Sequence, residues 1–172
     1  MPVIVQTLPP PEPTDLGRPA IEQIAQAFAQ HVGYRPGDDL DAIVKRLGGR
    51  IEIANTSHHG EIEVRSARDF TIYLPPHTGH LRNRFTIAHE LGHYVLHAKS
   101  GRNTLSVARN LDAYSRVEAE ANAFAAALLM PENVVLEVVE RDPSIAAIAA
   151  RCDVSMDAVA VRCRVLGLTI TD

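Results

Sequence analysis

Apolar positions in the first fifty residues recur with the period of amphipathic helices. Between residues 19 and 30 an apolar side chain returns every three or four positions, which predicts a helix with one buried face. The same period predicts a second helix that Asp38 or Asp39 caps and that ends near residue 47, where two glycines follow. The chain is therefore expected to begin with two helices.

Three short segments after these helices alternate between apolar and polar residues, as half-buried strands do. They cover residues 50–54, 61–65 and 69–74, and two prolines stop the last one. The turn between the first two holds His58 and His59, which could bind a metal, but nothing nearby completes a ligand set and we interpret it as a solvated turn. We predict a small antiparallel sheet whose edge strand could pair with an extended peptide.

Helical periodicity returns after the strands. Helices are expected over residues 81–98, 113–130 and 132–141, and the loop at 99–112 could border a cleft. The predicted fold class is therefore α+β, with a small sheet and helices packed against it.

Residues 143–168 are expected to form a C-terminal helical hairpin, with Ser155 capping its second helix. A helix, a short turn and a second helix also describe a DNA-binding helix-turn-helix, so DNA binding is one hypothesis for this segment. Its arginines are balanced by aspartates, however, and no basic face appears. We therefore expect the hairpin to pack on the rest of the protein.

The composition is that of an ordinary globular domain. Of the 172 residues, 46% are hydrophobic and 22% are charged, which suits one domain with its own core. Residues 1–15 are rich in proline, so we predict an extended N-terminal segment followed by a single domain over residues 16–172. Cys152 and Cys163 are too few for a disulfide framework and are interpreted as reduced packing residues.

Charge and hydropathy limit where the protein acts and what it binds. The formal net charge is -4, which argues against direct binding to nucleic acid. No apolar run reaches about 18 residues, and the N-terminus lacks the basic region of a signal peptide. A cytoplasmic protein that does not enter a membrane is predicted.

The candidate chemistry lies in the helix predicted over residues 81–98, which contains the motif His89-Glu90-Leu91-Gly92-His93. Histidines four positions apart lie on one face of a helix, so His89 and His93 can hold one zinc-like ion. The ion would lower the pKa of a bound water toward ~7, and Glu90 could take the proton of that water and pass it to a leaving amine. These roles are those of metal-assisted peptide hydrolysis.

A third ligand is expected from the helix over residues 113–130, because a catalytic zinc takes three protein ligands and keeps one open position. We favour Glu118, since Asn122 then lies one turn later and its amide could orient a metal-bound histidine. Glu120 is rotated about 200° from Glu118, so only one of the two can face the ion. The alternative is that both glutamates are solvated. Zinc suits this set best, but manganese or iron would also accept it.

The two segments together resemble the ImmA/IrrE family of metallopeptidases. The residues that carry the resemblance are Phe-Thr-Ile-Ala-His-Glu-Leu-Gly-His-Tyr-Val-Leu-His at 85–97 and Glu-x-x-Ala-Asn-x-Phe-Ala-Ala-x-Leu-Leu-Met-Pro, which ends at Pro131. The resemblance implies a zincin-like domain with the ion between two helices. It also implies that His89, His93 and Glu118 bind the ion, that Glu90 is the catalytic acid and base, and that the substrate is a helix-turn-helix repressor.

Three functional hypotheses follow. The first is a site-specific endopeptidase that cleaves such a repressor or a similar regulatory protein. The second is a peptidase-fold module that holds the metal and sequesters or senses a partner without cutting it, and the third is a DNA-binding regulator. The intact motif favours the first over the second, because a pure binder does not need Glu90.

Other side chains near the motif have weaker assignments. His77 and His80 precede the motif helix, and either could help to stabilise an oxyanion. His97 lies one turn beyond His93 and is interpreted as packed or hydrogen-bonded, because a third ligand from the same helix would need too tight a curve. Tyr94 is expected in the core.

Overall fold

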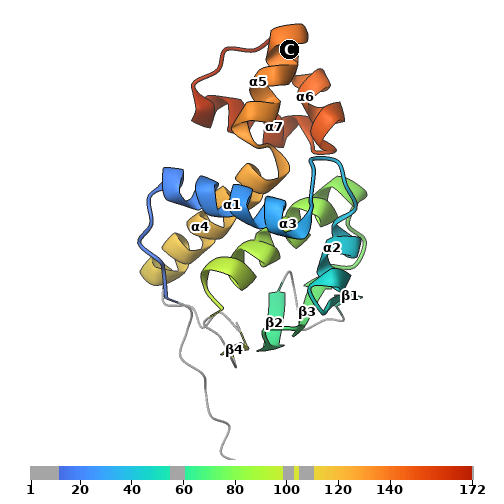
Figure 1. Cartoon of the computed structure of the whole chain (residues 1–172), viewed down its shortest axis with the longest axis vertical. Helices are drawn as coiled ribbons and strands as arrows, with labels where there is room; N and C mark the ends of the chain where they lie inside the picture. Colours follow the sequence, from blue (N-terminus) through green and yellow to red (C-terminus); the bar gives the residue numbers. More distant parts are fainter. Residues whose placement is uncertain (1–11, 55–60, 99–102, 105–110, 172) are drawn as a thin grey trace, which may run out of the picture.

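The computed structural model describes residues 12–54, 61–98, 103–104 and 111–171 (Figure 1). The proline-rich residues 1–11, the predicted turn with His58 and His59, and most of the predicted loop at 99–112 lie outside the described residues. In chain order the elements are α1 (Arg18–Val32), α2 (Leu40–Arg46), β1 (Gly49–Ile53), β2 (Glu61–Ser66), β3 (Asp69–Leu74), α3 (His80–Leu96), β4 (Asn103–Thr104), α4 (Leu111–Leu129), α5 (Glu132–Arg141), α6 (Ile145–Cys152) and α7 (Met156–Leu166).

The predicted α+β fold class is confirmed, and each predicted helix and strand is present with its ends moved by at most a few residues. Two predicted caps are found as expected. Asp39 accepts the backbone N–H of Asp41 at the start of α2, and Ser155 accepts the backbone N–H of Ala158 at the start of α7.

The sheet is mixed, so the prediction of an antiparallel sheet is right for one pair of strands and wrong for another. Its order is β1-β3-β2-β4, with β2 and β3 antiparallel but β1 and β3 parallel. Apolar alternation identifies a strand without giving its direction. The observed pairing places Gly49 opposite Phe70, and a Cβ at Gly49 would lie 2.3 Å from the Phe70 ring, so a glycine is needed where the start of β1 lies against the start of β3.

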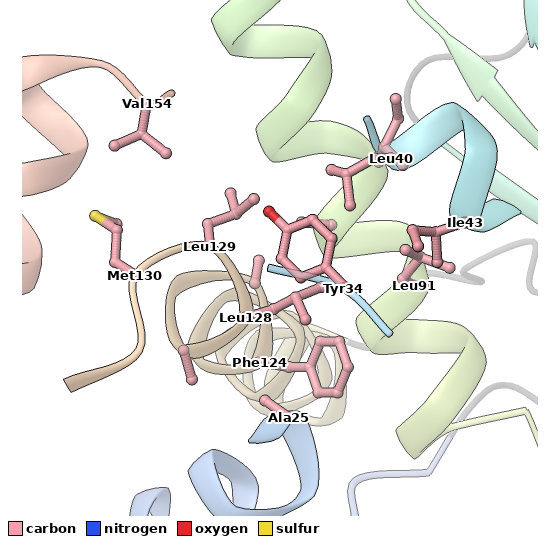
Figure 2. Packing of buried hydrophobic residues seen from close by; sticks show 14 of the residues in the cluster. Ala25, Tyr34, Leu40, Ile43, Leu91, Phe124, Leu128, Leu129, Met130 and Val154 are labelled. Carbon is pink, nitrogen blue, oxygen red and sulfur yellow. The ribbon is translucent and has the colours of Figure 1, made fainter. Parts of the chain in front are cut away.

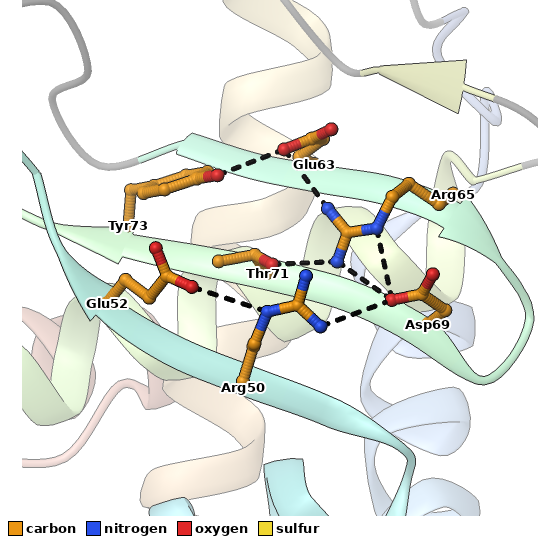
Figure 3. A network of polar contacts seen from close by, with 7 residues as sticks. All are labelled: Arg50, Glu52, Glu63, Arg65, Asp69, Thr71 and Tyr73. Carbon is orange, nitrogen blue, oxygen red and sulfur yellow. Dashed lines mark hydrogen bonds and ion pairs between the residues drawn. The ribbon is translucent and has the colours of Figure 1, made fainter.

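The two faces of the sheet have different environments. Phe70, Ile72 and Leu74 of β3 are buried, and α3 packs against β2 and β3. The opposite face carries a charged network (Figure 3), in which Arg65 donates to Asp69 at 2.8 Å and to Thr71 at 2.8 Å. The sheet thus presents its apolar face to the motif helix and its polar face outward.

The main core lies between α1, α3 and α4. Figure 2 shows Ala25 of α1, Leu91 of α3 and Phe124 and Leu128 of α4 gathered there, and all four are buried. A Cβ at Gly92 would lie 3.1 Å from the backbone oxygen of Ala121, so α3 and α4 approach closely at this glycine. This crossing sets the distance between the motif helix and the helix expected to supply the third ligand.

The C-terminal hairpin is attached by two buried arginines. Arg84 of α3 donates to the backbone oxygens of Asp153 and Asp38, at 3.0 and 2.7 Å. Arg162 of α7 donates to the backbone oxygen of Met130 at 2.9 Å and pairs with Glu22 of α1 at 2.7 Å. The contacts therefore hold the α6–α7 hairpin against the rest of the chain.

The length and hydropathy of each helix show whether it could cross a membrane. Among the described residues no single helix has the length and apolar character needed to cross a bilayer. One bent pair, Ser115–Leu129 followed by Glu132–Arg141, reaches that length and composition only when both helices are taken together.

Candidate metal centre

Three side chains converge where α3 crosses α4. His89, His93 and Glu118 each offer a ligand atom, and these atoms all lie within 4.8 Å of one another. The Nε2 atoms of the two histidines are 3.0 Å apart, and the carboxylate of Glu118 is 3.1 Å from each of them. The structure therefore brings together the three residues that the sequence predicts as metal ligands.

Asn122 and His97 fix the outward ring nitrogens of the two histidines. The Nδ1 of His89 lies 2.9 Å from Oδ1 of Asn122, so this Nδ1 carries the proton and donates. The Nδ1 of His93 lies 3.0 Å from Nδ1 of His97. The Nε2 of His89 is then left without a proton and faces inward, as ligation requires, and the same holds for His93 if it donates to His97.

Glu120 determines the direction of the second contact. Nε2 of His97 lies 2.9 Å from a carboxylate oxygen of Glu120, and a carboxylate only accepts, so His97 is protonated on Nε2. Burial lowers the pKa of His97, which keeps the ring neutral and makes its Nδ1 an acceptor. His93 must therefore donate from Nδ1 to His97.

Glu120 has contacts that the sequence did not predict. It is buried, so the alternative that both Glu118 and Glu120 are solvated is wrong. Its carboxylate also accepts the backbone N–H groups of Thr14 and Asp15, at 2.9 and 3.1 Å. Burial works to raise the pKa of Glu120, but these donors and His97 outweigh it and lower the pKa. His97 itself is packed and hydrogen-bonded, as predicted.

The donor set suits a cation. With both Nδ1 atoms protonated, two Nε2 lone pairs and a carboxylate point at one small volume, and such an arrangement is repulsive unless positive charge lies between the atoms. Burial tends to raise the pKa of Glu118, but the two histidines outweigh it and lower the pKa well below its usual range. Glu118 is therefore ionised at neutral pH, which is the form that binds metals.

The two histidines differ in charge preference. Burial is the largest influence on both, and it lowers the pKa of His93. Burial also acts to lower the pKa of His89, but the carboxylates of Glu118 and Glu90 outweigh it and raise the pKa. The lowered pKa favours the neutral form of His93 that ligation requires, whereas a cation would have to displace the proton that the raised pKa favours on His89.

Glu90 lies on α3 beside the triad and is only 2% exposed. Burial is the main cause that raises its pKa to about 8, with the nearby carboxylates of Glu118 and Glu61 adding to the effect and His89 opposing it. A carboxyl whose pKa lies near neutrality can accept and return a proton within one reaction cycle.

The other histidine and tyrosine candidates lie in different surroundings. His80 is exposed, and its Nε2 lies 2.7 Å from the carboxylate of Asp153, so it interacts with the C-terminal hairpin. His77 occupies the turn before α3 with a φ of 64°. Tyr94 packs on Phe70 with ring centroids 4.5 Å apart and donates its hydroxyl to the backbone oxygen of Ala67, so it is a partly buried residue at the edge of the core.

Comparisons with known proteins agree with this geometry. Residues 49–164 match the family model described as the IrrE N-terminal-like domain, a peptidase family. The structure is similar to that of a Mycobacterium tuberculosis transcriptional regulator, with a TM-score of 0.60 and 18% sequence identity, over 87% of this chain and 46% of that chain. The chain thus spans about half of that regulator, and at this identity the likeness concerns the fold alone. A comparison with curated proteins gave no match.

Proposed function

Since the chain belongs to the peptidase family of the IrrE N-terminal-like domain, we propose that it is a metal-dependent endopeptidase. The observation that carries the proposal is the convergence of His89, His93 and Glu118 with the buried Glu90 beside them. We assign the first three residues as ligands of a zinc ion, for which manganese or iron could substitute, and Glu90 as the catalytic residue.

A divalent cation at this position would supply Lewis-acid activation of water and of a peptide carbonyl. The protein supplies the proton transfers. Glu90, whose pKa is raised to about 8 by burial, accepts a proton from the attacking water and returns it to the leaving amine nitrogen. Asn122 and His97 hold the two imidazoles in the tautomer that leaves each Nε2 free.

We further propose that the substrate is a regulatory protein, with a helix-turn-helix repressor as the first candidate. The family match supports a protein substrate, and the structural neighbour is named as a transcriptional regulator. The second hypothesis, a module that holds a metal and sequesters a partner, leaves the buried Glu90 without a role. Cytoplasmic location stays a prediction from the sequence.

The test uses the zinc-loaded protein and the helix-turn-helix regulator encoded nearest to it. Intact mass is followed over time, with Glu90→Gln and a chelator-treated sample as controls. We expect one discrete cut that both controls abolish, which would also locate the bond. A stable complex without cleavage in zinc, manganese or iron would refute peptidase action and support sequestration.

A further inference from the structure

An apolar groove lies next to the candidate metal centre. It has a volume of about 790 Å³ and is bordered by the N-terminal part of α1, the first turns of α3, the middle of α4 and one side of α7. Its apolar lining includes Leu81, Phe85, Ala123, Ala126, Val161 and Val165. The groove is large enough to take several side chains of a partner.

The groove contains an unusual concentration of exposed apolar side chains. Leu81, Val161 and Val165 are 39%, 56% and 40% exposed. They make up three of the seven large hydrophobic residues that are exposed in the described part of the chain. Single exposed apolar residues are common, but a patch of them bordered by polar groups is typical of an interaction site.

The groove is adjacent to the candidate metal centre, although none of the three triad residues lines it. Asn122 lines the groove, and its side chain contacts His89. On α3, Phe85 in the groove lies one turn before His89, and on α4, Ala119 in the groove directly follows Glu118. A polypeptide bound in the groove would therefore have its next residues at the triad.

The walls of the groove favour a helical partner over an extended one. Most of the lining comes from four helices, whose backbone groups beyond the first turn are paired within the helix, and Val154 and Ser155 come from the turn before α7. An extended peptide would find no open strand edge there to satisfy its own N–H and C=O groups. A helix satisfies those groups internally and presents only side chains.

The rim of the groove carries positive charge on one side. Arg18 and Arg82 are exposed and lie in the first turns of α1 and α3. Both of these fully described helices begin without an acidic residue in the first turn and without a side-chain cap, so the positive ends of their dipoles add to the two arginines. Arg162 does not contribute, because Glu22 neutralises it. The exposed Asp157 on the α7 side also lines the groove, so the positive charge is confined to the side of Arg18 and Arg82.

We propose that this groove docks an amphipathic helix of the protein substrate, with an apolar stripe in the groove and acidic residues beside Arg18 and Arg82. The proposal rests on the proposed function, since it supplies the substrate recognition for the same site. It adds a specificity determinant that lies outside the triad: the substrate is selected by a helix next to the scissile segment.

The probe is a fluorescein-labelled helical peptide of about 18 residues, long enough to form several turns. It carries leucines at i, i+3, i+4 and i+7 with glutamates beside them, and a second probe has lysines in place of the glutamates. Fluorescence anisotropy is measured with the zinc-loaded Glu90→Gln protein, so that binding is observed without cleavage. We expect the glutamate probe to bind more tightly than the lysine probe.

Two leucines provide a matched pair of variants. Leu81 in the groove and Leu136 on α5 are both 39% exposed, but only Leu81 lines the groove. Leu81→Ser should weaken binding of the glutamate probe about tenfold, and Leu136→Ser should leave it unchanged. Arg82→Glu should weaken the glutamate probe and strengthen the lysine probe, each by about threefold or more, with little risk to folding because Arg82 is exposed.

The outcomes separate the groove from the peptidase. Equal binding by the two leucine variants, or no preference between the two probes, overturns the docking proposal. Binding of an apolar dye without binding of either peptide also overturns it and indicates a small apolar ligand. Selective probe binding without cleavage of any regulator supports the groove and rejects the proposed function. Cleavage of the regulator with the same kcat/KM in Leu81→Ser as in the wild-type protein supports the proposed function and overturns the docking proposal.

Discussion

Glu120 should influence metal affinity although it does not reach the candidate ion. Its carboxylate accepts from His97, which in turn accepts from Nδ1 of His93. Glu120→Ala removes the acceptor that fixes the tautomer of His97, so His97 can no longer select the tautomer of His93 that has a free Nε2. We therefore expect Glu120→Ala to weaken zinc binding and to destabilise the metal-free protein.

The size of both effects follows from burial. The side chain of His97 has no exposed area, so its Nε2–H would be left without an acceptor, which costs about 1–3 kcal/mol. The backbone N–H groups of Thr14 and Asp15 are partly exposed and can turn to water. A loss of about 2 kcal/mol in the free energy of unfolding should lower Tm by about 4–8 °C for a domain of this size. Loss of a contact behind a metal ligand typically weakens metal affinity about 10–100-fold.

Two measurements separate the effects. Urea unfolding in the presence of chelator gives the stability of the metal-free protein, and competition with a chromophoric chelator gives the affinity for zinc. Glu137→Ala is the control, because Glu137 is exposed and its pair with Arg141 should contribute less than about 1 kcal/mol. This control should match the wild-type protein in zinc affinity.

The conservative variant sharpens the test. Glu120→Gln keeps one oxygen for His97 and for the N–H of Thr14, but its NH2 group would face the N–H donor of Asp15. It should recover most of the zinc affinity and less of the stability. If Glu120→Ala lost stability but bound zinc as tightly as the wild-type protein, His97 and Glu120 would serve packing alone and the positioning role would be wrong.

Three further predictions concern the helix crossing, a buried ion pair and the catalytic carboxyl. Gly92→Val should destabilise the protein to urea by about 2 kcal/mol and weaken zinc binding, because its Cβ would press on Ala121; wild-type values would contradict this. Glu22→Ala should lower the urea stability by about 3 kcal/mol, since Arg162 is 2% exposed and would lose its partner; a change below about 1 kcal/mol would show that Arg162 relies on its other contact. The raised pKa of Glu90 favours the folded state below the unfolded value of 4.5 and that advantage is lost as the pH rises toward about 8. Between pH 5 and 8 in chelator, the wild-type protein should therefore lose about 3–4 kcal/mol of urea stability relative to Glu90→Gln, and parallel curves for the two proteins would refute it.

Sequence spacing identified the candidate site because its members lie close together along two helices. His89 and His93 share a face in any helix, as do Glu118 and Asn122, so only the meeting of the two faces was left open. The faces can meet closely because Gly92 has no side chain where the backbone of Ala121 approaches. Metal binding and catalysis by these residues stay predictions.

The direction of strand β1 could not be obtained in the same way. Alternation has a period of two in parallel and antiparallel strands alike, so it gives the faces of a strand and no orientation. In the order β1-β3-β2, Gly49 lies against the ring of Phe70, a contact between residues far apart in the chain that alternation does not reveal. In the sequence, Gly48 and Gly49 were interpreted only as the end of a helix, whereas Gly49 is the first residue of β1.

The role of Glu120 depended on contacts from two distant parts of the chain. The α4 helix packs against both α3 and α1, so a carboxylate on one of its covered faces must find a buried partner or remain protonated. Glu118 meets the two motif histidines, whereas Glu120 meets His97 and the backbone before α1. From spacing alone the surroundings considered for the two glutamates were the ion and solvent, and these are the only two surroundings for a helix with one buried side. In a helix covered on two sides, the second carboxylate is expected to support the ligands of the first.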